Sequence, residues 1–191
     1  MPALLSRAGA AREPRAQAQA VIPIALMQTV STPTLEDAVR GLRRGLEERG
    51  YKDGGRIRPT PFNAEGSADT ANSIALKMVD GTYKLLMTLT TTSLQAVSRT
   101  NKEIHIPHVF GIVSDPSIAG VGVRTMPASG ADKPAWLAGL GSMQPVESIF
   151  RAARRVNPNL KTVGVVWNPA EVNSEVTVKK ARAICKELGI T

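Results

Sequence analysis

Polar side chains that could hold a small molecule follow apolar, strand-like runs at four places in this sequence. The runs cover residues 22–27, 83–87, 108–113 and 163–167, and each is followed by Thr, Ser, Asn, Gln or Asp. In an open α/β sheet, ligands bind outside the carboxyl ends of the strands, where helix starts present free N–H groups and partial positive charge. The pattern predicts the rim of a small-molecule crevice and implies no reaction on the bound molecule.

The elements that must position these side chains alternate along the chain. Strand-like runs lie at about 21–27, 56–62, 83–89, 106–113 and 163–167, and helical spacing of apolar residues at about 34–49, 69–79, 94–97, 145–156 and 173–188. Alternation of this kind predicts an α/β fold with a mostly parallel sheet and right-handed crossovers. Pro59 and Pro61 place the second strand toward a sheet edge.

Three helix starts and one loop complete these expectations. Thr34, Asp69 and Asn173 are the expected caps of the first, second and last helices, because short polar side chains accept hydrogen bonds from the first turn. Residues 117–141 hold several Gly and Pro and no sustained period, which predicts a loop or crossover.

Composition argues against several classes of site. The 191 residues carry a net charge of +8, but the basic residues share their helices with acids, and only 4% of residues are aromatic. A stacking platform for nucleic acid is therefore not expected. Cys185 is the one cysteine and falls on an apolar helix stripe, which favours a buried thiol. His105 and His108 have no third ligand nearby in sequence, so neither a metal nor a cofactor is predicted.

The amino terminus has some features of an export signal. Residues 1–20 are rich in Ala and Arg and end in Ala-Gln-Ala-Gln-Ala, which is similar to a small-residue cleavage site. The apolar core after Met1 is too short for a secretory signal. Either a degenerate export signal or a disordered tail is predicted, and the first is favoured. No run reaches the ~20 apolar residues of a membrane span.

Five segments resemble one known family in their order. They are residues 25–28, 62–66, 90–96, 109–116 and 164–174, and the last is the most specific because Asn-Pro, Glu and Asn-Ser stand at the family's spacing. Over residues 21–191 the chain resembles the substrate-binding proteins of ABC transporters, whose better-known members resemble tryptophan- or tyrosine-binding lipoproteins.

The resemblance implies the fold of type I periplasmic binding proteins, in which two flavodoxin-like lobes close by a hinge around a ligand. It implies a nearly complete lobe I at 21–116, an inter-lobe segment at 117–141 and a partial lobe II at 142–191. Members of the family are considerably longer, so a truncated second lobe is expected.

An amino-acid ligand carries a carboxylate and an ammonium, and the resemblance implies residues for both. Thr91, Thr92 and Ser93 suit the carboxylate, because hydroxyls and backbone N–H groups meet at that helix start. Asp115 is the expected counter-charge for the ammonium, with Glu171 as a weaker candidate. The expected neutral hydrogen-bonding residues are Gln28, Asn63, Asn168, Asn173 and Ser174. The expected apolar wall is Met27, Trp167 and Met143.

The same residues could have structural roles instead of binding a ligand. Residues 90–93 and 173–174 could equally cap helices, and Asp115 before a proline is an ordinary turn residue.

The expected function is that of a solute-binding component of an ABC importer, without catalysis. The resemblance implies a periplasmic or extracellular location, an aromatic or branched amino acid as ligand, and an ABC permease in the membrane as partner. A ligand-sensing domain of a receptor or regulator on the same fold is the alternative. An enzyme is disfavoured, since the sequence has no phosphate-binding glycine loop and no nucleophile elbow.

Overall fold

The computed structural model describes residues 20–124 and 132–191 of the chain. Residues 1–19, where an export signal is predicted, lie outside the described part. The described strands are β1 (Ile22–Gln28), β2 (Ile57–Asn63), β3 (Leu85–Leu89), β4 (His108–Val113) and β5 (Leu137–Gly141). The helices are α1 (Pro33–Glu47), α2 (Ala68–Met78), α3 (Thr91–Asn101), α4 (Val146–Val156) and α5 (Val172–Glu187).

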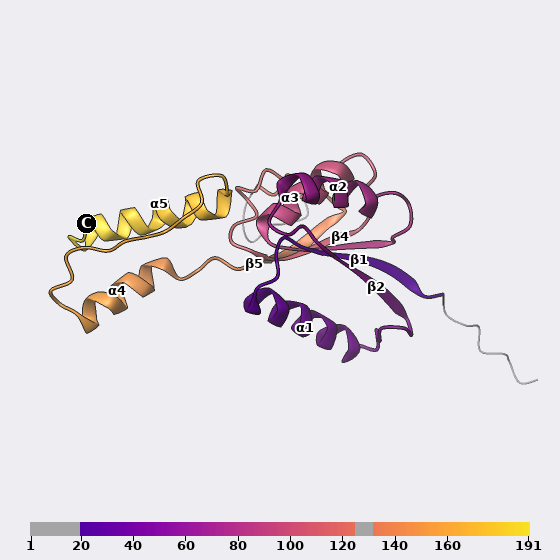
Figure 1. Cartoon of the computed structure of the whole chain (residues 1–191), viewed down its shortest axis with the longest axis horizontal. Coiled ribbons are helices and arrows are strands. Elements are labelled where there is room, and N and C mark those ends of the chain that lie inside the picture. The colour runs from indigo at the N-terminus through magenta and orange to yellow at the C-terminus, as the bar shows by residue number, and fades with distance from the viewer. Residues whose placement is uncertain (1–19, 125–131) are drawn as a thin grey trace, which may run out of the picture.

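The five strands form one parallel sheet in the order β2-β1-β3-β4-β5 (Figure 1). The predicted α/β class, parallel sheet and edge position of β2 are therefore confirmed. Gln28 at the end of β1 pairs with Asn63 of β2 and with Leu89 of β3. The carboxyl ends of these strands thus stand level, and the polar residues that follow them meet at one edge of the sheet.

Helices cover the sheet on both faces, with α1 on one side and α2 and α3 on the other (Figure 1). Side chains alternate along each strand, so Leu26 packs in a cluster with Leu35 of α1, while Met27 packs in a cluster with Met78 of α2. Met27 has no exposed surface. The prediction that Met27 walls the ligand crevice is therefore wrong, because it belongs to the buried core.

The segment 117–141, which was predicted to be a loop or crossover, contains strand β5. Strand β5 pairs in parallel with β4, with Leu137 opposite His108. A side chain at Gly139 would stand 2.4 Å from the carbonyl oxygen of Phe110 and 2.5 Å from its ring. The glycine that suggested a loop is thus required by close packing between two strands.

Two helix caps differ from the prediction by two residues. The hydroxyl of Thr32 accepts a hydrogen bond from the backbone N–H of Leu35 at 3.4 Å, and Ser67 accepts one from Thr70 at 3.2 Å. Thr34 and Asp69 lie in the first turns instead. Pro33 explains the earlier start of α1, because proline suits the first helical position.

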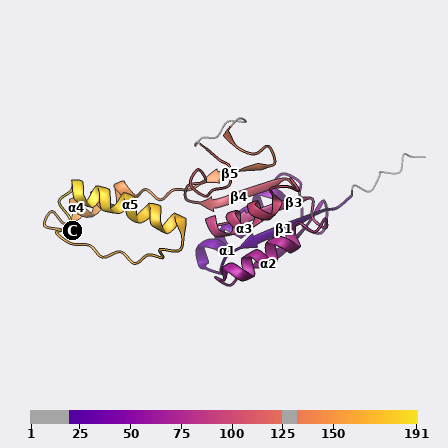
Figure 2. The same cartoon turned by 90° about the horizontal axis from the view of Figure 1, so that it is seen from above.

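Helices α4 and α5 pack against each other and lie to one side of the sheet (Figure 2). Val146 and Phe150 of α4 meet Ala181 and Ile184 of α5. Cys185 is buried, as predicted. No helix in the described residues is both long and apolar enough to cross a bilayer.

The predicted strand at residues 163–167 does not form. The segment is extended, and the N–H of Val163 donates to the carbonyl of Thr191 at 2.8 Å, but Val166 is fully exposed. A strand needs a neighbour along its whole length, and within the described residues only Thr191 pairs with this segment.

Candidate functional site

A cavity of about 280 Å³ lies at the carboxyl edge of the sheet. It is bounded by the ends of β1 and β4 and the starts of α1, α3 and α5. Its lining residues are Thr29, Val30, Thr32, Thr34, Leu35, Thr90, Thr91, Thr92, Ile112, Ser114, Glu171 and Asn173. We call it the crevice, and its position is the one that the sequence analysis predicted for ligand binding.

Hydroxyl groups fix the floor of the crevice. Thr29 Oγ1, just after β1, lies 2.5 Å from Thr90 Oγ1 and 2.9 Å from Ser93 Oγ. Thr90 also caps α3, since its hydroxyl accepts from the N–H of Ser93 at 3.4 Å. These contacts tie the end of β1 to the turn between β3 and α3. Ser93 is fully buried in this network, and Thr91 is only 4% exposed, although it lines the crevice together with Thr92.

Two residues of the crevice hold unfavourable backbone conformations. Thr90 has φ 95° and ψ 157°, a region used almost only by glycine, and Ile112 has φ 54°. Ile112 lies where the register between β4 and β5 shifts, between Phe110 and Val113. Backbone strain of about 1–3 kcal/mol a residue persists only where surrounding structure enforces it, and it concentrates at ligand sites.

The starts of α1 and α3 both supply residues to the crevice. The first turn of α3 carries no acidic residue. Its free N–H groups and helix dipole are therefore not neutralised locally, and they favour an anionic group of a ligand. Thr91 and Thr92 add hydroxyls beside those N–H groups.

The start of α5 contributes Glu171, which is the one charged residue among the described residues that line the crevice. Its carboxylate accepts hydrogen bonds from the side-chain amides of Asn168 at 3.1 Å and Asn173 at 3.4 Å. Ser174 accepts from the backbone N–H of Asn168 at 3.1 Å. Asn168 and Ser174 thus shape the turn, while Glu171 and Asn173 face the crevice.

Asn173 does not cap α5, contrary to the prediction. The cap position is Glu171, which makes no side-chain capping bond, and Asn173 is the second residue of the helix. Its amide is turned to the Glu171 carboxylate.

Gln28 and Asn63 line a neighbouring hollow of about 350 Å³ rather than the crevice. The amide of Gln28 donates to Ser31 at 3.0 Å and to Glu36 at 3.1 Å, and the amide of Asn63 donates to Ser31 at 3.0 Å. Hydrogen bonds from Gln28 and then Ser31 lower the pKa of the Glu36 carboxyl. The structure brings Gln28 and Asn63 together, beside the other candidates but not among them.

Asp115 forms a tight turn. Its Oδ1 accepts hydrogen bonds from the N–H of Ser117 at 3.0 Å and from the Ser117 hydroxyl at 2.5 Å. The preceding residue, Ser114, lines the crevice and Asp115 does not. Trp167 lines a third hollow, with Val163 and Val165, and lies within 5.8 Å of the Arg182 guanidinium.

Sequence reasoning missed several residues that line the crevice. Thr29 and Ser114 follow directly after strands, and Thr32 caps α1, so the rule that polar residues after strands line the crevice could have predicted them. Ile112 gave no such signal, because its exposure depends on a local irregularity of β4.

Known proteins similar to this chain agree with the fold. The family described as ABC transporter substrate binding protein matches residues 23–191. A tyrosine-binding protein from Clostridioides difficile is 30% identical over 164 residues, which are 86% of this chain and 46% of that protein. The chain therefore spans about half the length of this relative.

Solved structures give the same picture. A conserved domain protein from Vibrio cholerae is 29% identical, with a TM-score of 0.82 over 90% of this chain and 56% of that one. A ligand-free, open substrate-binding protein with adhesive properties from Clostridium difficile is 31% identical, with a TM-score of 0.68 and the same coverage. An ABC domain from Streptococcus pneumonia in complex with L-Trp shares the fold at 24% identity, with a TM-score of 0.81 over the same shares of the two chains.

The family match over most of the chain and the shared fold confirm the resemblance found in the sequence, including the type I periplasmic-binding-protein class. This chain belongs to the family of ABC transporter substrate binding proteins.

Proposed function

We propose that the crevice binds a free amino acid for an ABC importer, without catalysis. The observation that carries this proposal is the pairing of opposite charges across one cavity. The start of α3, which carries Thr91 and Thr92 and no acidic residue, and the Glu171 carboxylate at the start of α5 line the same cavity. A zwitterion with its carboxylate at α3 and its ammonium at Glu171 satisfies both sides.

Glu171 takes the role that the sequence analysis gave first to Asp115. Asp115 does not line the crevice, whereas Glu171 does, with its carboxylate held in place by the side-chain amides of Asn168 and Asn173. Val30, Leu35 and Ile112 supply apolar surface for the ligand's side chain. The volume and these residues favour a branched or aromatic side chain over a charged one.

The proposed function also assigns the residues of this chain to two lobes. Residues 21–116 would form most of lobe I, and residues 142–191 would belong to lobe II, with closure bringing α5 toward α1 and α3. The named relatives support a periplasmic or extracellular location and an ABC permease as partner. No feature of the described residues favours the ligand-sensing alternative.

The test is a thermal melt of the chain with each common amino acid at high concentration. A ligand that binds only the native state stabilises it, by about 1.4 kcal/mol when its concentration is tenfold above Kd. We expect a raised Tm for one apolar or aromatic amino acid, with weak affinity, because the crevice is partly open to solvent.

Glu171→Gln provides the matched test of the ammonium site. This variant should fold normally and lose the Tm rise, while Glu175→Gln, one turn further along α5 and outside the crevice lining, should keep it. A Tm rise that survives Glu171→Gln would place the ligand elsewhere. No rise with any amino acid, for this chain and for a longer form of it, would overturn the proposal.

A further inference from the structure

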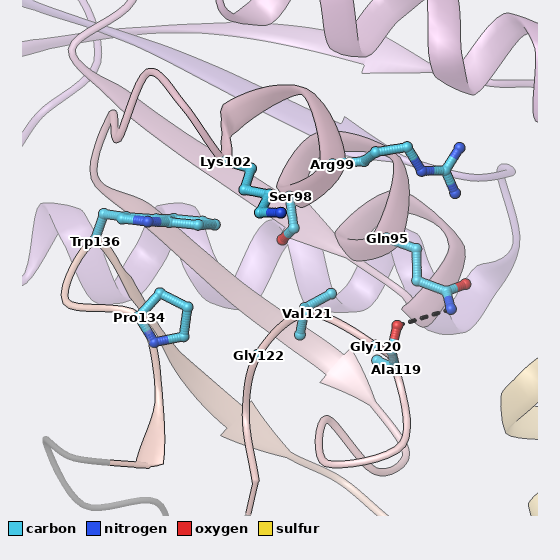
Figure 3. A pocket seen from close by; sticks show the side chains of 10 residues that line it. All are labelled: Gln95, Ser98, Arg99, Lys102, Ala119, Gly120, Val121, Gly122, Pro134 and Trp136. Carbon is cyan, nitrogen blue, oxygen red and sulfur yellow. Dashed lines mark hydrogen bonds between the residues drawn. The ribbon is translucent and has the colours of Figure 1, made fainter.

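A second cavity, of about 410 Å³, lies on the other half of α3 (Figure 3). It is enclosed by α3, by the loop at residues 119–122 that follows β4, and by the turn that leads into β5. It shares no lining residue with the crevice. We call it the α3 cavity.

A polar stripe of α3 forms one wall of the α3 cavity. Gln95, Ser98 and Arg99 of α3 stand at helical spacing with Lys102, the residue that caps its end, and Figure 3 shows all four beside the cavity. The Gln95 amide donates to the carbonyl of Ala119 at 2.9 Å and joins the helix to the loop. Ser98, Arg99 and Lys102 take no part in that hydrogen bond.

Ser98 is the unusual member of the stripe. Its residue is 5% exposed, and its hydroxyl has no hydrogen-bond partner among the described residues. Buried hydroxyl groups are nearly always hydrogen-bonded, so an orphaned one beside a cavity points to a missing partner.

Positive charge borders the same space. Arg99 and Lys102 are both exposed, and no ion pair is found for either within residues 20–124 and 132–191. None of the described residues that line the cavity is acidic. Lys102 and Ser98 are one helical turn apart, so the Lys102 ammonium and the Ser98 hydroxyl can bind the same anionic group of a ligand.

Trp136 closes the opposite side with the rim of its ring. The indole stacks against the His105 ring, with centroids 6.0 Å apart, and against the His108 ring, at 6.3 Å. Figure 3 shows the indole edge-on, with its rim directed into the cavity. The rim of an aromatic ring is its positive part and tolerates an anion. Val121 and Pro134 add apolar surface beside it.

From these contacts we propose that the α3 cavity binds a small organic carboxylate. The carboxylate lies beside the Lys102 ammonium, and a rotation of the Ser98 side chain, whose hydroxyl is closed to solvent in this structure, turns that hydroxyl to the carboxylate and gives it the acceptor it lacks. The apolar part of the ligand packs on Val121, Pro134 and the rim of Trp136. The volume falls within the range of small-molecule sites. The site is separate from the proposed amino-acid crevice and does not depend on it.

The test is an NMR titration of the ¹⁵N-labelled chain with phenylacetate, which carries a carboxylate and no ammonium. The chain has two tryptophans, so Trp167→Phe assigns the two indole N–H signals. We expect a saturable shift of the Trp136 signal with phenylacetate and none with 2-phenylethanol, its neutral counterpart.

Two variants test the named groups. Lys102→Gln and Ser98→Ala should each weaken phenylacetate binding by about tenfold or more, since each removes a hydrogen bond to a charged group. Lys77→Gln, a lysine of α2 outside the cavity lining, and Glu171→Gln in the crevice should leave it unchanged. Ser98→Ala should not lower the Tm, because its hydroxyl has no partner to lose.

Three outcomes would contradict binding of a carboxylate in the α3 cavity. An unshifted Trp136 signal, equal binding of 2-phenylethanol, or equal loss in Lys77→Gln would overturn the proposal. Equal loss of the phenylacetate shift in Glu171→Gln would move the ligand to the crevice. If Ser98→Ala does not fold, Lys102→Gln alone decides, because Lys102 is an exposed side chain.

Discussion

His108 shows how one buried residue links this fold to pH. Its Nε2 lies 2.8 Å from the Thr88 hydroxyl, its Nδ1 has no partner within the described residues, and the side chain is almost fully buried. Burial lowers the pKa of the His108 imidazole to about 4. The folded chain therefore keeps this ring neutral at pH values where an unfolded chain would charge it.

The stability of the chain should fall as the pH drops from about 6.5 to about 4. An unfolded histidine takes up a proton near pH 6.5, and His108 in the fold does so only near pH 4, so acid favours the unfolded chain by up to about 1.4 kcal/mol per pH unit. Urea unfolding at pH 7, 5.5 and 4.5 measures this. His108→Gln should have a shallower slope in this window, and an unchanged slope would contradict the burial argument.

At the scale of elements, Gly139 shows which contact holds β5 in the sheet. Gly139→Ala should destabilise the chain by about 1–3 kcal/mol, because the new methyl group would overlap the backbone and ring of Phe110. Gly41→Ala in α1 is the matched control, since no atom lies within 4 Å of its new methyl group. It should stabilise the chain by about 0.5–1 kcal/mol.

Urea unfolding of both variants gives the comparison. If Gly139→Ala were as stable as the original chain, β5 would not be packed on Phe110 as the structure describes.

The sequence predicted those elements whose signals are local. Strands β1 and β3 are apolar runs because a parallel sheet buries both of their faces, and their type was clear from composition. Strand β5 was predicted to be a loop, and residues 163–167 were predicted to be a strand. Both predictions failed for one reason. A strand exists only beside a partner strand, and the partner is set by the tertiary fold and not by the segment itself.

The candidate site was predictable to a similar depth. Four of the predicted residues line the crevice: Thr91 and Thr92, which follow β3, and Glu171 and Asn173, which follow the extended segment at residues 163–167. Gln28 turned to Ser31 and Glu36 instead, because strand pairing does not decide toward which side of the edge a side chain bends.

Considered as a whole molecule, this chain exposes single apolar side chains on β5, at the end of α4 and in the segment at residues 163–167. Leu140 of β5 is 72% exposed, and Val156 and Val166 are exposed more fully. Exposed apolar side chains of this size lose their contact with water when two molecules associate through them. We expect sedimentation velocity to show a concentration-dependent shift toward larger species.

Replacing Leu140 and Val166 by serine should reduce this association. Leu76→Ser, which removes an exposed leucine of α2 outside these elements, should change it little. Sedimentation that stays monomeric at all concentrations for the original chain would contradict the expectation.

The strained backbone at Thr90 and Ile112 also bears on how such a chain can be altered. Each position costs free energy in every folded molecule, whether or not the crevice is filled. Selection for heat resistance alone would favour glycine there first, and would thereby erase the side chains that shape the crevice. Thermal robustness and recognition therefore compete at these two positions, and screens for hardier variants should score both traits together.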